Sequence, residues 1–147
     1  MIEHFSSDLT RWLSNFYPCD ITFEGKTYTS IEHAYMSAKS LDPNWKQFCI
    51  ETEDPRAVKE RFREIKLIPE WENIKVDVMR ECVTQKFSKE PFRSKLLDTK
   101  NEYIQEGNWW NDRFWGVDLK SNPPVGKNML GILIMEVRSN LITDEIL

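Results

Sequence analysis

The segment 127–139 constrains the fold of this chain more than any other part of the sequence. Its apolar residues would occupy almost every side of an α-helix: Met129, Leu130, Ile132, Leu133, Ile134, Met135 and Val137. A helix that is apolar all round has to be covered by other elements. The sequence therefore predicts a buried helix from Lys127 to about Ser139, in the middle of a domain. At 147 residues, the chain is long enough to build one such domain around its own core.

The remaining segments predict an α+β fold. The stretch "ITFEGKTYT" (21–29) alternates β-formers across Glu24 and Gly25, which is typical of a short hairpin. We expect helices at 30–40, at 69–88 and after Pro43, Pro55 and Pro91, with extended segments at 102–106 and 113–119. The sum is a compact, mostly helical single domain over residues 1–147, with a small β-sheet.

Composition narrows the class of protein. The net charge of −4 argues against a broad basic face that coats nucleic acid. No apolar run approaches the roughly 20 residues that span a bilayer, and the first residues lack a secretory pattern. The three cysteines are widely spaced and only two histidines occur, so we expect reduced thiols, no metal site and no cofactor. These features predict a cytoplasmic protein with no membrane partner, and nothing indicates an obligate protein partner.

The predicted helix 30–40 carries two charged residues near its buried face. Its buried direction is defined by Ile31, Ala34, Tyr35 and Ala38. Glu32 and Lys39 lie on the shoulder of that face, roughly 10 Å apart along the axis. They are either functional groups or partners in ion pairs with neighbouring elements. The same geometry places His33, Ser37 and Ser40 on the opposite side, so we expect His33 to be a solvated surface residue.

The stretch "PPVGKNML" (123–130) precedes the apolar helix. Gly126 permits an unusual backbone angle, and Lys127 and Asn128 lie beside the first-turn N–H groups, which favours a phosphate cradle. The stretch is not a Walker A loop, because it has no upstream glycine at the required spacing. Ordinary helix capping is the alternative reading of the same residues.

The stretch "NWWNDRFWG" (108–116) concentrates aromatic rings around Asp112. Trp109, Trp110 and Trp115 fit the wall of a site that holds a flat base, since aromatic faces stack on bases. A carboxylate among rings is costly unless it is bonded or has a function. The alternative is a core cluster in which Asp112 caps a turn. If the backbone is extended, Phe114 turns into the core and one of Trp109 and Trp110 does the same.

Several of these motifs, in this order, resemble the YbiA-like family, also called NADAR for its association with NAD and ADP-ribose. The resemblance covers nearly the whole chain. It rests on "LSNFYP" (13–18), "SIEHAYMSAK" (30–39), "KF" (86–87), "LLDT" (96–99), "EGNWWNDRFWG" (106–116) and "GKNMLGILIMEVR" (126–138). The doubled tryptophan and Lys127 between Gly126 and Asn128 are not explained by the family pattern.

The resemblance implies the compact α+β fold of the family and an enzyme that cleaves N-glycosidic bonds. Some relatives hydrolyse phosphorylated intermediates of riboflavin synthesis, and others remove ADP-ribose from guanine bases of DNA. The expected partner is thus a small phosphorylated, nucleotide-like substrate or an ADP-ribosylated guanine. A non-catalytic module that senses ADP-ribose or NAD is the alternative. The family's polar signature positions fall on Asn15, Glu32, Lys39, Asp112, Asn128 and Arg138.

These positions suggest a mechanism as a hypothesis. Glu32 and Asp112 would stabilise charge on ribose, activate water or protonate the leaving group, in an order that the sequence does not assign. Lys39 would either bind phosphate or attack the ribose carbon through a neutral amine. The expected binding residues are Asn15, Phe16, Tyr35, Trp109, Trp115, Gly126, Lys127, Asn128 and Arg138, with the phosphate held by Lys127, Asn128 and the helix N-terminus.

Overall fold

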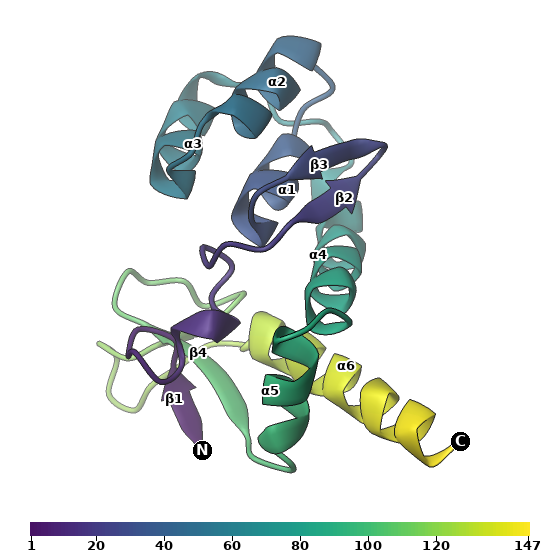
Figure 1. Cartoon of the computed structure of the whole chain (residues 1–147). Helices are drawn as coiled ribbons and strands as arrows, with labels where there is room; N and C mark the ends of the chain where they lie inside the picture. Colours follow the sequence, from purple (N-terminus) through teal and green to yellow (C-terminus); the bar gives the residue numbers. More distant parts are fainter. The chain divides into compact units, whose positions relative to one another are not determined.

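The computed structural model describes residues 1–147, and contacts within the chain group them into two compact units (Figure 1). One unit, here called the middle unit, runs from Asn15 to Lys86. The other, the terminal unit, joins Met1–Ser14 to Phe87–Leu147. Each unit has its own small sheet and its own helices, and each is described by itself below.

The middle unit is built around one short helix. α1 (Ile31–Ser37) contacts the hairpin of β2 (Ile21–Phe23) and β3 (Lys26–Tyr28), and also α2 (Pro43–Glu51) and α3 (Pro55–Arg61). The one-turn 3-10 helix η2 (Phe62–Glu64) follows α3, and α4 (Trp71–Phe87) closes the unit. The predicted hairpin is confirmed, with Glu24 and Gly25 both at positive φ in the two-residue turn that such hairpins favour.

The N-termini of these helices follow the rules used to predict them. The side chains of Ser30, Asp42 and Asp54 each accept a hydrogen bond from the first turn of α1, α2 and α3, respectively. Proline fills the first helical position of α2 and of α3, where its missing N–H costs nothing. The predicted starts at Pro43 and Pro55 are therefore confirmed.

The expectation that one side of α1 faces solvent is wrong. All residues of α1 are buried, and His33 is only 1% exposed. Ser37 and Ser40, predicted to lie on the same solvated side, are buried as well. The reason lies in the tertiary structure, because α2, α3 and the hairpin all contact α1. The side of α1 that carries polar residues is therefore covered as well.

The terminal unit holds a three-stranded parallel sheet of order β1–β4–β5. β4 (Ile104–Asn108) lies between β1 (Ile2–His4) and β5 (Val117–Asp118), and α6 (Met129–Ile146) packs against it. The short helix α5 (Phe92–Asp98) contacts α6, and the 3-10 helix η1 (Arg11–Leu13) supplies buried Trp12 and Leu13. Of the predicted extended segment 113–119, only β5 joins the sheet.

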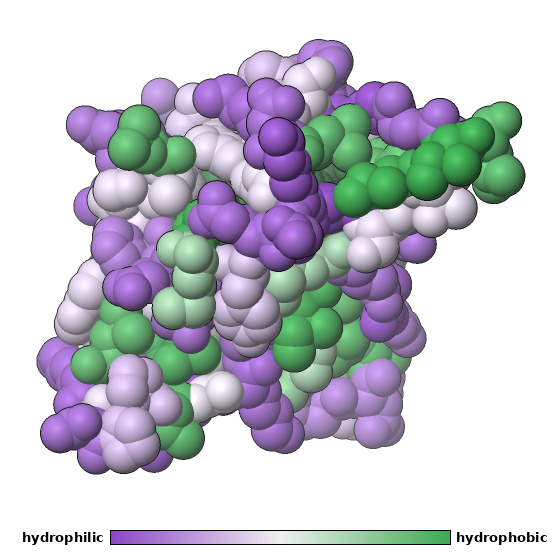
Figure 2. Space-filling model, turned by 90° about the horizontal axis from the view of Figure 1, so that it is seen from below, coloured by the Kyte–Doolittle hydropathy of each residue, from purple (hydrophilic) through white to green (hydrophobic).

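The final helix is less enclosed than its composition predicts. Helix α6 begins at Met129 rather than Lys127 and continues beyond Ser139 to Ile146. Leu130, Leu133, Ile134, Val137 and Leu141 are buried, but Ile132, Ile142 and Ile146 are exposed. The exposed apolar end of α6 forms a hydrophobic strip in Figure 2. Hydrophobicity all round thus overstated the burial of α6, although one face of the helix does supply the core of this unit.

The α+β class, with more helix than strand and only small sheets, is confirmed. No helix of the chain combines the length and the apolar character needed to cross a membrane. All three cysteines are free, in line with the expected thiols. Burial raises the pKa of the Cys49 and Cys82 thiols to about 12, so both are unreactive near neutral pH.

Candidate functional site

The first turn of α1 holds Glu32 inside the middle unit. The Ser30 hydroxyl accepts the N–H of His33 at 3.2 Å, and the N–H of Glu32 donates to the carbonyl of Asn15 at 3.0 Å. Glu32 is 8% exposed, which is unusual for a carboxylate. The capped helix start and the 13–18 segment therefore fix the position of a buried carboxylate, as the shoulder geometry suggested.

The ammonium group of Lys39 lies among three aromatic rings. Its Nζ is 4.7 Å from the ring centre of Phe62, 5.2 Å from that of Tyr35 and 5.9 Å from that of Trp71. The side chain makes no hydrogen bond or ion pair. Burial lowers the pKa of Lys39 below its ordinary value, with the nearby Glu32 carboxylate opposing the shift. The ring faces attract the ammonium form, whereas burial disfavours it and lowers the pKa of Lys39.

Tyr35 and Trp71 form one side of this aromatic cage, at 5.1 Å between ring centres in an edge-to-face arrangement. Tyr35 is 6% exposed, so its role in the structure is to hold the cage around Lys39, and it offers little surface to a ligand. Phe62 and Trp71 were not predicted as site residues. Trp71 was read only as part of the core stripe of 69–88, and no periodic pattern places Phe62 beside Lys39.

Asn15 carries the one buried side-chain N or O atom that has no hydrogen-bond partner, Oδ1. Its Nδ2 is 3.6 Å from the sulfur of Met79, a weak acceptor. A buried acceptor without a donor costs free energy, and such groups call for an explanation. A donor group on a ligand, such as a ribose hydroxyl, supplies one.

A hollow of about 720 Å³ lies between the N-terminal end of α1 and the connection from α2 to α3. Phe16 contributes to its wall, together with Ser30 and His33 from α1. Its volume is within the range typical of small-molecule sites. Phe16, predicted as a binding residue, is thus part of a concave surface of the middle unit.

In the terminal unit, Asp112 organises a tight turn. Its Oδ1 accepts the N–H groups of Phe114 at 3.1 Å and of Trp115 at 2.9 Å. The Asn108 side chain bonds both the N–H and the carbonyl of Asp112. The turn-capping role left open by the sequence is therefore real. The second carboxylate oxygen, Oδ2, accepts no hydrogen bond, so the capping role uses only half of the group.

The expected division of the tryptophan pair into one core and one surface ring is wrong. Trp109 is 42% exposed, with its ring 5.3 Å from that of His4, and Trp110 is 58% exposed. Phe114, predicted to turn into the core, is half-buried, as is Trp115, and their rings meet edge to face at 4.9 Å. The alternation argument fails because 109–116 forms bends and turns rather than a strand.

The backbone N–H groups expected to cradle a phosphate at the start of the last helix are engaged within the protein. The N–H groups of 127, 128, 129 and 130 donate to the carbonyls of 113, 116, 114 and 115, at 2.8 to 3.2 Å. These donors would have to face a phosphate. Because the Asp112 turn presents its carbonyls to them, the helix start is capped by the protein's own backbone.

The Asn128 side chain is likewise engaged within the unit. Its Oδ1 accepts the N–H of Glu106 at 2.9 Å, and its Nδ2 donates to the carbonyl of Ile104 at 2.9 Å and to the Tyr103 hydroxyl at 3.3 Å. Asn128 is 2% exposed and left-handed, with φ of 54°. These bonds join the start of α6 to β4.

Gly126 is required for the packing of two backbone segments. A Cβ at this position would collide with the carbonyl oxygen of Gly116, so the two segments can approach only with glycine there. Lys127 is exposed, and its Nζ lies 5.5 Å from the ring centre of Phe114. Of the predicted cradle, only the side chain of Lys127 remains able to meet an anion.

Arg138 is buried on α6 and bonds within the terminal unit. Its Nη1 donates to the Thr99 hydroxyl at 2.8 Å, which joins α6 to the end of α5. Burial lowers the pKa of Arg138, and Glu102 opposes the shift. Arginine remains charged in proteins, so the residue is a cation held by Thr99 and by the field of Glu102.

Apart from Trp109 beside His4 and Arg138 beside Thr99, the predicted residues form two groups, one in each unit. Asn15, Glu32, Tyr35 and Lys39 gather around α1, with Phe16 in the adjacent hollow. Asp112, Trp115, Gly126, Lys127 and Asn128 gather around the start of α6. Lys86 was missed as an ionisable group: it is fully buried, and burial lowers its pKa from 10.5 to about 7. No three His, Cys, Asp or Glu side chains are placed to hold a metal ion together.

Comparison with known proteins relates this geometry to a family. A family model described as "NADAR domain" matches residues 4–142. The chain is 32% identical to the N-glycosidase YbiA of Escherichia coli over 135 residues, 90% of this chain and 82% of that protein. It is 34% identical to the riboflavin biosynthesis protein VVA0006 of Vibrio vulnificus, but spans only 35% of that longer protein. The NMR structure of E. coli YbiA superposes with a TM-score of 0.81 and 30% identity, over 99% of this chain and 89% of that chain.

Proposed function

The chain belongs to the NADAR domain family, and from this premise we propose that it is a hydrolase of N-glycosyl bonds. Its substrate would join ribose, as a phosphate or as ADP-ribose, to a nitrogen base or amine. The name of the E. coli relative, N-glycosidase YbiA, supports this reaction class. The observation that carries the proposal is the placement of buried Glu32 in the first turn of α1 and of Lys39 just after its end, where the Glu32 carboxylate is near enough to act on the pKa of Lys39.

Lys39 has the properties of a nucleophilic amine. A lysine attacks a carbon only when its nitrogen is neutral, and burial is one way to make the neutral form accessible near neutral pH. The pKa of Lys39 is lowered by that burial, and the side chain forms no ion pair that would hold the proton. The cage of Tyr35, Phe62 and Trp71 fixes the nitrogen without using its lone pair.

The reaction then proceeds by displacement and hydrolysis. As the bond from ribose C1 to the base nitrogen breaks, the base leaves with the bonding electrons and takes up a proton. The Lys39 nitrogen bonds to C1 and, after losing its own proton, forms an imine with the opened sugar. Water cleaves this imine and releases the free sugar and the amine. Glu32 moves the protons, and the Asn15 Oδ1 accepts a hydrogen bond from a ribose hydroxyl.

Between the two substrate classes, we propose a phosphorylated intermediate of riboflavin synthesis. The Vibrio relative and a maize relative, 29% identical over 92% of this chain, are both named as riboflavin biosynthesis proteins. The net charge of −4 also disfavours a large nucleic acid substrate. ADP-ribosylated guanine in DNA is the competing substrate, and a sensor that binds ADP-ribose without turnover is the competing class.

The test incubates the purified protein with both substrates and follows release of the base or amine. The arms are wild type, Lys39→Met, Glu32→Gln and Asp112→Asn, each checked for folding by circular dichroism. Addition of borohydride during turnover would reduce the imine and add the sugar mass to the peptide that contains Lys39. Absence of this adduct together with full activity of Lys39→Met would refute the lysine mechanism. Tight binding of ADP-ribose with no turnover of either substrate would establish the sensor instead.

A further inference from the structure

Two side chains of α2 bond the last carbonyl groups of α1. A helix leaves its final carbonyls without partners inside the helix, so these groups need donors from elsewhere. The Nε1–H of Trp45 donates to the carbonyl of Met36 at 2.9 Å. The ammonium group of Lys46 donates to the carbonyl of Ser37 at 3.0 Å. The Met36 carbonyl also accepts the backbone N–H of Lys39 at 3.2 Å, so Trp45 and Lys39 share one acceptor at the end of α1.

The ring of Trp45 contacts the aromatic cage as well. Its centre lies 5.7 Å from that of Phe62, and the Phe62 ring centre lies 4.7 Å from the Nζ of Lys39. Phe48 stacks on Trp45 at 5.8 Å between ring centres. Because Trp45 is only 2% exposed, its packed neighbours keep the indole in one orientation. Trp45 thus acts on Lys39 by two routes, one through the backbone and one through the cage.

Both routes matter for the placement of the Lys39 nitrogen. A displacement of about 1 Å can lower the rate of an enzymatic step about 100-fold, and a lysine carries its amine on a flexible stem. The backbone of Lys39 is bonded on both sides, because its carbonyl accepts the N–H of Ile68 at 2.9 Å while its own N–H is held at the end of α1. With the backbone fixed in this way, the ring of Phe62 limits the positions that the side chain can take.

We propose that Trp45 and Lys46 are positioning residues for Lys39. Together they hold the end of α1, and Trp45 also holds the ring of Phe62, so that the amine stays in one place within its cage. Both act on the reaction only through Lys39. The inference rests on the proposed role of Lys39 as the nucleophile, and it makes turnover depend on α2, which carries none of the predicted site residues.

The first experiment measures the reactivity of Lys39 without any substrate. Trace acetylation with acetic anhydride at several pH values, read by mass spectrometry of the peptides, follows the neutral fraction of each amine. Burial lowers the pKa of Lys39, so its amine should react at lower pH than that of the exposed Lys26. Trp45→Phe removes the indole N–H and part of the ring, which should admit water to the cage and move the Lys39 profile to higher pH. An unchanged profile would overturn the proposal.

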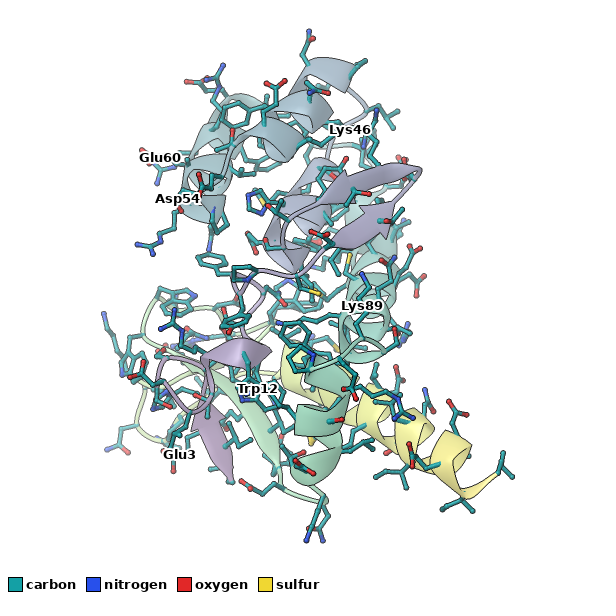
Figure 3. The ribbon with its side chains drawn as sticks, in the orientation of Figure 1. Glu3, Trp12, Lys46, Asp54, Glu60 and Lys89 are labelled. Atoms are coloured by element: carbon teal, nitrogen blue, oxygen red, sulfur yellow. The ribbon has the colours of Figure 1, made fainter.

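Trp12→Phe is the matched control. Trp12 belongs to the terminal unit (Figure 3), and its Nε1–H donates to the carbonyl of Leu9 at 3.0 Å. Its buried ring contacts that of Phe87 at 6.2 Å between centres. The control therefore loses the same kind of hydrogen bond, and we expect its Lys39 profile to match wild type. An equal shift in the control would assign the effect to general loosening of the protein and overturn the proposal.

Lys46→Met tests the same end of α1 with a smaller change. Lys46 is half-buried on α2 (Figure 3), so the loss of its bond to the Ser37 carbonyl endangers folding less than a change at Trp45 does. We expect the Lys39 profile to move in the same direction by a smaller amount, because Trp45 still contacts Phe62. A wild-type profile in Lys46→Met would overturn the proposal.

Turnover separates this inference from the function on which it rests. In the active enzyme, Trp45→Phe should lower kcat about tenfold and leave KM within about twofold of wild type, because the nucleophile is displaced while the binding groups stay. If the wild type hydrolyses a substrate and both variants keep its kcat, the positioning role is overturned and the N-glycosidase proposal stands. If the acetylation profiles shift as expected but the wild type hydrolyses neither substrate, the two residues position Lys39 and the proposed activity fails.

Discussion

The first N–H groups of α1 and of α6 find their hydrogen-bond acceptors in different ways. At α1, one serine side chain caps the helix, Glu32 is buried in its first turn, and the half-buried Lys39 lies just after its end with a pKa lowered by burial. At α6, the first N–H groups and the side chain of Asn128 are all bonded within the unit. The α1 region has a buried acceptor without a donor, Asn15 Oδ1, whereas nearly all polar groups at the start of α6 are hydrogen-bonded within the unit.

This contrast separates residues that are available to a substrate from residues that stabilise the fold. A side chain whose bonds are all made to the protein contributes to stability, because a ligand would have to break those bonds first. A buried amine without an ion pair, or a buried carbonyl oxygen without a donor, destabilises the protein, and such groups gather at functional sites. Both segments carry motifs of the family, but only the α1 region has a buried side-chain acceptor without a donor, Asn15 Oδ1.

The strongest test of the contrast is Lys39→Met. Methionine fills a similar volume in the aromatic cage and carries no charge, so we expect stability to be retained or to increase. Turnover should fall at least about 10³-fold, because no other amine replaces the nucleophile. The measurement is single-turnover kinetics beside a thermal melt. Lys26→Met, at an exposed lysine of β3 that is not among the charges acting on Lys39, is the control and should leave both quantities unchanged.

The reverse result is expected for Asn128→Ala. The change removes an acceptor and two donors at a buried position, so we expect the free energy of unfolding to drop by about 2–4 kcal/mol. Urea denaturation measures this. Under conditions where the variant is folded, KM for the phosphorylated substrate should match wild type. A large rise in KM without loss of stability would restore Asn128 as a phosphate ligand.

The buried side chain of Lys86 predicts that the free energy of unfolding depends on pH. Because its folded pKa is about 7 and its ordinary value is 10.5, the unfolded chain binds more protons between these values. The free energy of unfolding should therefore rise with pH from about 7 to 10.5, and the penalty for burying the charge should be complete below pH 7. Lys86→Met should flatten this slope in urea titrations at several pH values. An unchanged slope would show that Lys86 does not cause it.

Asp112→Asn tests a residue with both roles. Asparagine keeps an oxygen that can accept the N–H groups of Phe114 and Trp115, so stability should change by less than about 1 kcal/mol. If the predicted catalytic role is correct, turnover falls about 10²-fold through loss of the charge. Asp112→Ala, which also loses the turn, is the comparison variant. Full activity of Asp112→Asn would leave only the capping role.

The smallest effect is expected at Trp110. Its ring is exposed, so Trp110→Ala should alter the free energy of unfolding by no more than about 0.5 kcal/mol. Trp109→Ala should cost slightly more, since its ring contacts His4. Thermal melts of the two variants compare these costs. A KM effect confined to one of them would identify the ring that meets the ligand.

Local rules in the sequence predicted the elements of both units well. The caps at Ser30 and Asp54, the prolines that begin α2 and α3, and the Glu24–Gly25 turn act over a few residues, so the chain shows them directly. Glu32 was correctly placed at the margin of the core for the same reason. The expected exposure of His33 and the expected extended backbone of 113–116 were wrong, because each depends on what packs or turns around it.

The sequence by itself determined the α+β class, the capped helices and the motifs that mark the family, since periodicity and capping are written in neighbouring residues. Only the tertiary structure decided which motif residues are engaged. Carbonyls from 113–116 occupy the start of α6, and rings from three elements surround Lys39. Such contacts join residues distant in the chain, and their burial sets the cost of every unpaired charge, so no local pattern encodes them.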